Sequence, residues 1–293
     1  MGRLDDKIAI ITGGGAGMGR IACQRFAAEG AKVVVADNNA DGAAETVEAI
    51  TAAGGTALPA TVDVRDAGQV EAMVKIAVDN WGGLDILYNN AGVSPGDDDT
   101  PLNTSEETWQ FTFDVNVKGL FLCNKYGIQA MLDSGGGSIV NVASFVAHMG
   151  AATPQIAYTS SKGAVLAMTQ EIAAIYARQG IRANALCPGP IMTPLLAKFL
   201  SDDAKRNRLK EILSKAYMVG NARPNGLSGP AEMGSSTASV SPNADRRARN
   251  SSAVFRVAIF WKFIRRDGSG FVSFGEAIMF PPIWCLRWPL GTE

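Results

Sequence analysis

Residues 7–19 read KIAIITGGGAGMG, a short apolar run that leads into a cluster of glycines. The run over residues 7–12 is typical of a strand buried on both faces in a parallel sheet. The glycines allow a tight turn and let the backbone approach a pyrophosphate at the N-terminus of the next helix. We expect that helix to begin near Gly17, because apolar residues follow with helical spacing over residues 21–27. The stretch therefore predicts a strand, a phosphate-binding turn and a helix.

The same alternation continues along the chain. Helical patterns cover residues 40–53 and 66–81, and a long apolar stretch covers residues 111–131. The further strands that we expect lie over residues 32–36, 56–62, 84–88, 138–142 and 182–187. Strands that alternate with such helices predict an α/β fold, a doubly wound parallel sheet of Rossmann-like type in a single three-layer domain. A ligand should bind beyond the carboxyl ends of the strands, where Gly13, Asp37, Asp63 and Asn89 fall.

Asp37 bears on the choice of cofactor. It ends the second expected strand, 18 residues beyond Gly19. A carboxylate there accepts hydrogen bonds from a ribose 2′-hydroxyl and repels a 2′-phosphate, which favours NAD over NADP. The alternative is that Asp37 begins a turn with Asn38 and Asn39 and caps the next helix, since Asp and Asn favour both roles.

Tyr158 and Lys162 stand four residues apart, so they share one face if the segment is helical. A nearby ammonium favours the phenolate and lowers the pKa of a tyrosine, which is about 10 in isolation. The pair could therefore move a proton near neutral pH. Alone, such a pair is more often a tyrosine lying beneath a solvated lysine, and the upstream context decides between the two.

Composition bears on the partners, metal sites and cellular compartment to expect. The 293 residues are 47% hydrophobic and 19% charged, with a formal net charge of −1, which gives no reason to expect nucleic acid or a membrane as partner. We see no signal-peptide pattern and no apolar run of about 18 residues. Four scattered cysteines without zinc spacing and a single histidine, His148, predict reduced thiols, no metal site and a cytoplasmic protein.

Taken together, the motifs resemble those of the short-chain dehydrogenases/reductases over roughly residues 5–200. The matching residues are Thr12-Gly13-x-x-x-Gly17-x-Gly19, Asn89-Asn90-Ala91-Gly92, Asn116, Ser144, Tyr158-x-x-x-Lys162 and Pro188-Gly189. The resemblance implies an NAD(H)-dependent oxidoreductase acting on CH–OH groups, which interconverts a secondary alcohol and a ketone by hydride transfer. It also implies a small-molecule alcohol or ketone as substrate and a homodimer or homotetramer.

The same resemblance implies individual roles. Tyr158 would be the catalytic acid/base, Ser144 would bind the substrate oxygen, and Lys162 would hold the nicotinamide ribose and lower the pKa of the tyrosine. Asn116 would complete a proton relay through water to Lys162. The implied cofactor contacts are Thr12, Gly13, Gly17, Met18, Gly19, Asp37, Asp63, Val64, Asn89, Ala91, Gly92, Tyr158, Lys162, Pro188, Gly189, Ile191 and Thr193. The loops over residues 93–104 and 193–217 should line the substrate site.

The C-terminal part departs from the family. We expect a catalytic domain over residues 1–220, a low-complexity linker over 221–250 and an atypical segment over 251–293, where the family's further helix and seventh strand are not recognisable. From Ala244 the chain carries eight basic and four acidic residues, a net charge of +4 against −5 for the rest. We interpret this change as a retained intron or shifted reading frame. The alternative is a genuine extension with an amphipathic or interface segment over residues 255–264.

Two other functions remain open beside the oxidoreductase. An aberrant C-terminal part could leave a catalytically impaired dinucleotide-binding or scaffold protein, although Ser144, Tyr158 and Lys162 are all present. A hydrolase using Ser144 and His148 has less support, because the serine lies in Ala-Ser-Phe and not in a Gly-x-Ser-x-Gly turn.

Overall fold

The computed structural model describes residues 2–151, 153–189 and 191, together with the backbone of two strands over residues 258–264 and 271–276. Its described strands form one sheet in the order β3-β2-β1-β4-β5-β6-β7-β8. The first six are parallel and are β1 (Ile8–Thr12), β2 (Lys32–Asp37), β3 (Thr56–Thr61), β4 (Ile86–Asn89), β5 (Gly137–Val142) and β6 (Ile181–Pro188). The strand order reverses at β1 and β4, which is where doubly wound sheets bind ligands.

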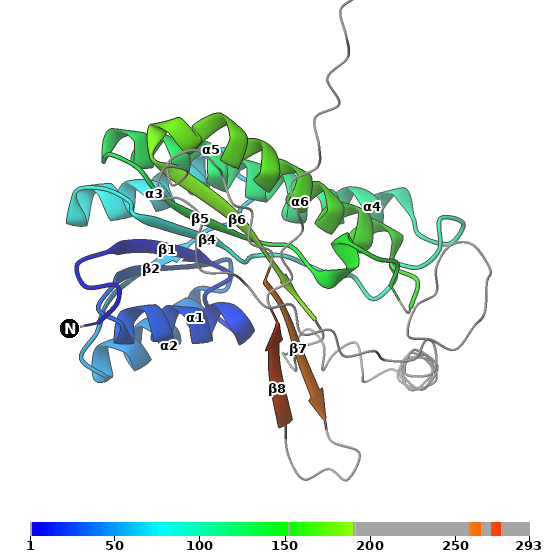
Figure 1. Cartoon of the computed structure of the whole chain (residues 1–293), viewed down its shortest axis with the longest axis horizontal. Helices are drawn as coiled ribbons and strands as arrows, with labels where there is room; N and C mark the ends of the chain where they lie inside the picture. The colour runs from blue at the N-terminus through cyan, green and yellow to red at the C-terminus, as the bar shows by residue number, and fades with distance from the viewer. Residues whose placement is uncertain (1, 152, 190, 192–257, 265–270, 277–293) are drawn as a thin grey trace, which may run out of the picture.

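Helices cover both faces of this sheet (Figure 1). On one face lie α1 (Gly17–Ala28) and α2 (Ala40–Ala52). The other face carries α3 (Ala67–Trp81), α4 (Glu106–Phe113), α5 (Leu120–Asp133) and α6 (Ile156–Tyr176). The prediction of a three-layer, doubly wound parallel sheet is confirmed. No helix among the described residues is long and apolar enough to cross a membrane.

The central strands are apolar along their whole length because both of their faces are covered. Ile11, Val33 and Val35 pack in the cluster formed with α1 and α2. Ile10 and Val34 pack in the larger cluster on the opposite face. All five are fully buried. Burying such a side chain contributes about 1.5–3 kcal/mol, so these strands hold the two helical layers together.

Polar residues at the helix ends fix where α2 and α3 begin. The Asn39 side chain accepts from the Gly42 amide at 3.2 Å and caps α2, and the Asp66 side chain accepts from the Gln69 amide at 2.9 Å and caps α3. The cap of α2 is therefore Asn39 and not Asp37, which leaves the Asp37 carboxylate available for the loops beside it.

The apolar stretch over residues 111–131 is not one regular helix. A π-helical segment, η1 (Asp114–Gly119), separates α4 from α5. Asn116 and Gly119 are buried within it, and an ideal Cβ at Gly119 would lie 2.6 Å from Val64 Cγ2. Such wider turns occur frequently at functional sites, because they change which way side chains and carbonyls point. Two short 3₁₀ turns, η2 (Phe145–Ala147) and η3 (Ala177–Gln179), flank α6.

Two strands follow β6 in the sheet. β7 (Ala258–Ile264) pairs in parallel with β6 through Leu186↔Ala258, Cys187↔Ile259 and Pro188↔Phe260, and β8 (Phe271–Glu276) pairs antiparallel with β7. The sequence did not make a seventh strand recognisable, and the structure places one over residues 258–264, within the segment that the alternative interpretation treated as amphipathic. The aromatic and β-branched composition of residues 258–264 favours a strand, and the pairing covers part of an edge that β6 would otherwise expose. The expected linker over 221–250 lies outside the described residues.

The close approach of Gly19 to Gly13 predicts a strong effect of substitution. An ideal Cβ at Gly19 would lie 2.0 Å from the Gly13 carbonyl oxygen, so Gly19→Ala must push the glycine loop away from α1. We expect a loss of about 1–3 kcal/mol in the free energy of unfolding, as overpacking commonly costs. The control is Gly163→Ala in α6, where a Cβ meets no atom within 4 Å and should add about 0.5–1 kcal/mol. Urea denaturation measures both; a Gly19→Ala midpoint equal to that of the wild type would contradict the prediction.

Candidate active site

A cavity of about 310 Å³ lies at the carboxyl ends of β1, β2 and β4. Eight of the predicted cofactor contacts line it: Gly13, Gly17, Met18, Asp37, Asp63, Val64, Ala91 and Gly92. Lining residues that were not among the predicted cofactor contacts include Ala16, Asn38, Arg65, Asn90, Val93 and Phe111. The structure thus brings residues from the first, second, third and fourth strand ends to one place, as expected.

Thr12 and Asn90 tie the loop after β1 to the loop after β4. The Thr12 hydroxyl accepts from the amides of Asn90 and Ala91 at 3.0 and 3.1 Å. The Asn90 side chain donates to the carbonyls of Thr12 and Gly13 at 3.0 and 3.2 Å. Thr12 is therefore a positioning residue behind the cavity. Asn90 both lines the cavity and fixes the loop after β1. Its position within the Asn-Asn-Ala-Gly motif is the sequence signal that could have identified it as a site residue.

Asn89 lies in a buried amide cluster behind the cavity. Its Nδ2 donates to Asn141 at 2.8 Å and to Asn124 at 3.3 Å, and Asn141 donates to Thr169 at 3.0 Å. The cluster links β4 to β5, α5 and α6 through side chains. Asn89, Gly19, Pro188, Gly189 and Ile191 are not among the residues lining the cavity. Thr193 lies outside the described residues.

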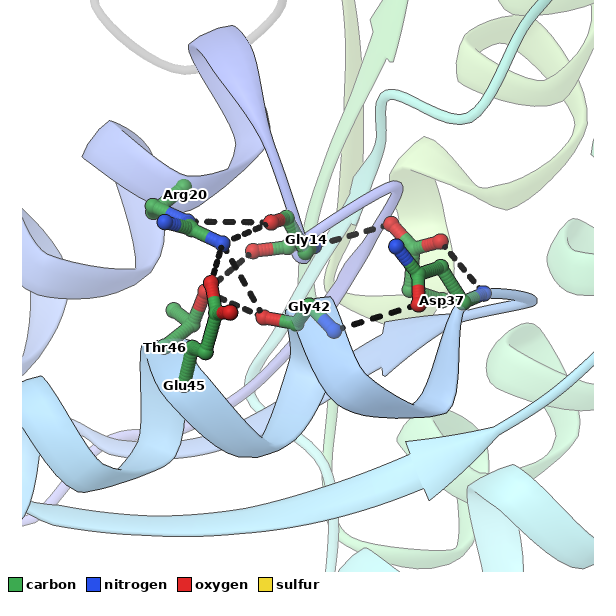
Figure 2. Close-up of polar contacts among 8 residues, drawn as sticks. Gly14, Arg20, Asp37, Gly42, Glu45 and Thr46 are labelled. Atoms are coloured by element: carbon green, nitrogen blue, oxygen red, sulfur yellow. Dashed lines mark hydrogen bonds and ion pairs between the residues drawn. The ribbon is translucent and has the colours of Figure 1, made fainter.

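Hydrogen bonds fix the glycine loop from several sides (Figure 2). The Asp37 carboxylate accepts from the amide of Gly15 at 2.8 Å and from that of Asn39 at 2.9 Å. Arg20 donates through Nε to the Gly15 carbonyl at 2.9 Å and pairs with Glu45 at 2.8 Å. The loop is consequently anchored to β2 and α2, and the Asp37 carboxylate is held at the edge of the cavity.

Arg65 and Phe111 form part of the wall beside Asp63. The Arg65 guanidinium lies 2.6 Å from an Asp63 oxygen and 5.5 Å from the centre of the Phe111 ring. Hydrogen bonding from Arg65 lowers the pKa of Asp63 below its usual value, so this carboxylate stays ionised. Val64, the next residue, lies against η1 and keeps its backbone beside the cavity.

The four predicted catalytic residues come together from three elements. Ser144 follows β5, Tyr158 and Lys162 share one face of α6, and Asn116 lies in η1. The Lys162 ammonium is 5.6 Å from the centre of the Tyr158 ring, and the Ser144 side chain lies close enough to the Tyr158 phenol to act on its pKa. An ideal Cβ at Gly92 would lie 3.1 Å from Asn116 Oδ1 and 3.4 Å from Lys162 Nζ. The cluster therefore adjoins the Gly92 end of the cavity.

Burial dominates the electrostatics of this cluster. It lowers the pKa of Lys162 to about 8, and it raises the pKa of Tyr158 above its usual value while the hydrogen bond with Ser144 acts in the opposite direction. The Lys162 ammonium donates to the Val142 carbonyl at 2.8 Å. The expectation that Lys162 depresses the pKa of Tyr158 is therefore wrong in this structure, because desolvation of the phenolate outweighs every attraction it receives.

Asn116 uses its amide to hold the loop after β4. Its Oδ1 accepts from the Val93 amide at 2.8 Å, and its Nδ2 donates to the Val93 carbonyl at 2.9 Å and to Ser161 Oγ at 3.0 Å. The buried Asn116 amide is thus satisfied by the backbone of Val93 and by the Ser161 hydroxyl. A proton relay from Lys162 past Asn116 would have to use the main chain of Asn116, because its side chain is already bonded to Val93 and Ser161.

His148 lies beside a thiol. Its Nε2 is 3.5 Å from Cys187 Sγ, whereas the described contacts include no bond between His148 and Ser144. The contact needed for a Ser144/His148 hydrolase is thus not found among the described residues. Nor do those residues contain a group of three His, Cys, Asp or Glu side chains placed to hold a metal ion.

Comparison with known proteins agrees with this geometry. The family model of the short chain dehydrogenases matches residues 7–204. A 2,5-dichloro-2,5-cyclohexadiene-1,4-diol dehydrogenase of Sphingobium indicum is 41% identical, over 75% of this chain and 85% of its own length. A cyclohexanol dehydrogenase of an Acinetobacter species is 36% identical, over 67% of this chain and 78% of its own.

Among solved structures, levodione reductase superposes with a TM-score of 0.67 at 33% identity, over 72% of this chain and 83% of its own. Levodione reductase shares the overall fold of this chain, and all three of these relatives are named as dehydrogenases or reductases. The chain therefore belongs to the short-chain dehydrogenase family of oxidoreductases.

Proposed function

We propose that the chain is an NAD(H)-dependent dehydrogenase that interconverts a secondary alcohol and a ketone. The observation that carries the proposal is the meeting of Ser144, Tyr158 and Lys162 beside a cavity at the strand-order reversal. A hydroxyl, a phenol and an ammonium supply hydrogen bonding, a transferable proton and a positive charge. These are the groups that a carbonyl needs as it accepts a hydride.

The cavity fits a dinucleotide. The glycine loop leads into α1, whose first amides face it, and Gly13 has a φ of 65° with its ideal Cβ only 2.7 Å from Asn90 Nδ2. A side chain there would collide with Asn90 and Ala91, so glycine lets the loop after β1 pack against the loop after β4 at the edge of the cavity. Asp37 stands where the adenosine ribose would lie, which supports NAD in preference to NADP. The bound nicotinamide supplies or accepts the hydride.

The protein's own residues handle the proton. In ketone reduction, Ser144 hydrogen-bonds the substrate oxygen and Tyr158 gives its phenolic proton to that oxygen. In alcohol oxidation, the same phenolate takes the proton back. Because burial raises the pKa of Tyr158, the resting residue carries its proton and is ready for reduction. Lys162, with a pKa of about 8, exchanges protons near neutral pH and can return one to the tyrosine.

The names of the relatives suggest where to look for a substrate. Two of them are named for cyclic alcohols, a cyclohexadiene diol and cyclohexanol. We infer that an alicyclic secondary alcohol is the first class to test. A spectrophotometric screen of alicyclic and linear alcohols and ketones, following NADH, tests the proposal. Binding of NADH without turnover of any of them would favour the dinucleotide-binding or scaffold alternative.

We further infer a homodimer or homotetramer working in the cytoplasm. Trp109, Phe111 and Phe121 on α4 and α5 expose 38, 42 and 51% of their surface, and exposed apolar side chains of this kind often mark contacts between subunits. Cys23, Cys123 and Cys187 are buried free thiols, which suits a reducing compartment.

The first prediction from this proposal concerns Asp37. The wild type should show a higher kcat/KM with NAD(H) than with NADP(H), and Asp37→Ala should narrow the ratio because the carboxylate no longer repels a 2′-phosphate. The ratio of the two kcat/KM values is the informative quantity. Asp37 also accepts a hydrogen bond from the Gly15 amide, so its loss should weaken the binding of both cofactors. Asp41→Ala, an exposed carboxylate in the first turn of α2, is the control. A wild type that prefers NADP(H) would show that Asp37 has been misassigned.

The second concerns Tyr158. Tyr158→Phe keeps the ring but removes the proton, so kcat should fall by about 100- to 10,000-fold while the Kd for NADH stays within error. Steady-state kinetics and NADH fluorescence titration measure the two. Tyr176→Phe, at the other end of α6, removes a phenolic hydroxyl from the same helix and should retain activity. A loss below tenfold, with chemistry rate-limiting, is incompatible with the role.

The third follows from the pKa of Lys162. Since burial lowers it from 10.5 to about 8, the native state releases this proton before the unfolded state does. Between pH 8 and 10 the contribution of Lys162 to the free energy of unfolding should therefore rise, by at most about 1.4 kcal/mol per pH unit. Urea unfolding across this range should show wild type gaining stability relative to Lys162→Met. Lys125→Met, at an exposed lysine, should follow the wild type. Parallel curves for wild type and Lys162→Met would refute the prediction.

A further inference from the structure

The helix that carries Tyr158 begins without a cap of its own. In α6 the first bond of helical type runs from the Thr159 amide to the Gln155 carbonyl at 2.9 Å. The amides of Ile156, Ala157 and Tyr158 have no acceptor within the helix, and the side chain of the N-cap residue Gln155 accepts no capping bond. Buried amides of this kind need acceptors from elsewhere.

All three acceptors come from two neighbouring residues of a distant loop. The Asp99 carbonyl accepts from the Ile156 amide at 3.1 Å. The two oxygens of the Asp98 carboxylate accept from Ala157 at 3.0 Å and from Tyr158 at 2.8 Å. Asp98 precedes Tyr158 by 60 residues in the sequence. The start of the catalytic helix is therefore completed by the loop after β4.

The Asp98 carboxylate is well suited to this position. Its residue is only 4% exposed, and one of its oxygens also accepts from the Thr104 hydroxyl at 3.3 Å. Thr104 in turn accepts from the Asp99 amide at 2.8 Å, which fixes the loop backbone. A negative charge at the N-terminus of a helix is favoured by the aligned peptide dipoles, and hydrogen bonds to a carboxylate are stronger than those to a neutral oxygen.

The same loop is attached to α6 at a second point. Its first residue, Val93, is bound through both backbone groups to Asn116, which also donates to Ser161 in α6. The loop over residues 93–104 is the one expected to line the substrate site. Asp98 thus binds the helix at Ala157 and Tyr158, and Asn116 connects the loop to it about one turn later, at Ser161.

We propose that Asp98 is a positioning residue that holds the backbone of Tyr158, and so its phenol, in place beside Ser144. Asp98 does not line the dinucleotide cavity, and its role is separate from cofactor binding. The inference rests on the proposed function of Tyr158 as the acid/base. It adds that proton transfer depends on a carboxylate that touches neither substrate nor cofactor.

Asp98→Asn tests this role. The variant keeps the size of the side chain but removes its charge and turns one of its two acceptors into an NH₂ group facing an amide donor. Because a displacement of about 1 Å can cost about 100-fold in rate, we expect kcat to fall by about 10- to 100-fold. The Kd for NADH should be unchanged. The solvent isotope effect on kcat should increase, because transfer of the Tyr158 proton becomes slower relative to the other steps.

The matched control is Asp99→Asn. It makes the same change of charge in the neighbouring residue, keeps the backbone carbonyl that binds Ile156, and disturbs one side-chain bond, to Asn103 at 3.1 Å. Its kcat and isotope effect should equal those of the wild type. If Asp98→Asn fails to fold, Thr104→Val removes one bond to Asp98 and the acceptor of the Asp99 amide, and should change the same quantities in the same direction by less.

Hydrogen exchange measured by mass spectrometry supplies a readout that does not need turnover. A peptide spanning residues 155–160 should exchange faster in Asp98→Asn than in the wild type and in Asp99→Asn. Faster exchange with an unchanged kcat and isotope effect would overturn the positioning role, and unchanged exchange would overturn the cap itself. A wild type that binds NADH but turns over no alcohol would refute the proposed function and the catalytic half of this inference, while the exchange result would still decide the cap.

Discussion

The parallel pairing of β1 with β2 on one side and β4 on the other is the constraint on which the rest of the structure depends. The register sets Thr12 opposite Ala36 in β2 and opposite Asn89 in β4, so three strands end at the same level. The loops that follow them are forced together there. Once that level is fixed, short polar side chains such as Thr12 and Asp37 can reach the neighbouring loop backbone and hold it.

The site contains both exposed and buried ionisable groups, and the two kinds lie in different parts of it. At the cavity, the Asp63 carboxylate pairs with Arg65 at the surface, and hydrogen bonding from Arg65 keeps the pKa of Asp63 below its usual value. Around Tyr158 and Lys162, burial favours the uncharged forms instead. Lys162 is only 4% exposed, and burial lowers its pKa and raises that of Tyr158. Two groups whose neutral forms are favoured by burial therefore lie next to a region that holds a fixed charge. The separation suits a reaction in which one part of the ligand is only held and another part changes its protonation.

Much of this could be predicted from sequence because its signals are local. The apolar run before Gly13 and the acidic end of β2 each occupy a few consecutive residues, and the fold predicted from them is confirmed. The interruption at η1 could not be predicted, because an apolar stretch with helical spacing carries no mark of one extra residue per turn. The pKa of Tyr158 was misjudged because a sequence shows its neighbouring charge but not its burial. Asp98 was missed because its partners lie 60 residues away and Asp-Asp-Asp-Thr looks like a solvated loop.

The cap of α6 also limits how this scaffold can be redesigned. Substrate loops are the natural segments to exchange between related enzymes, since they vary in length and lie at the surface. Here the loop over residues 93–104 supplies the acceptors for the first three amides of α6, the helix that carries Tyr158. A loop transplanted for a new specificity must therefore bring a carboxylate and a carbonyl to the same two positions. A graft chosen for its substrate contacts alone would leave the catalytic helix unfinished.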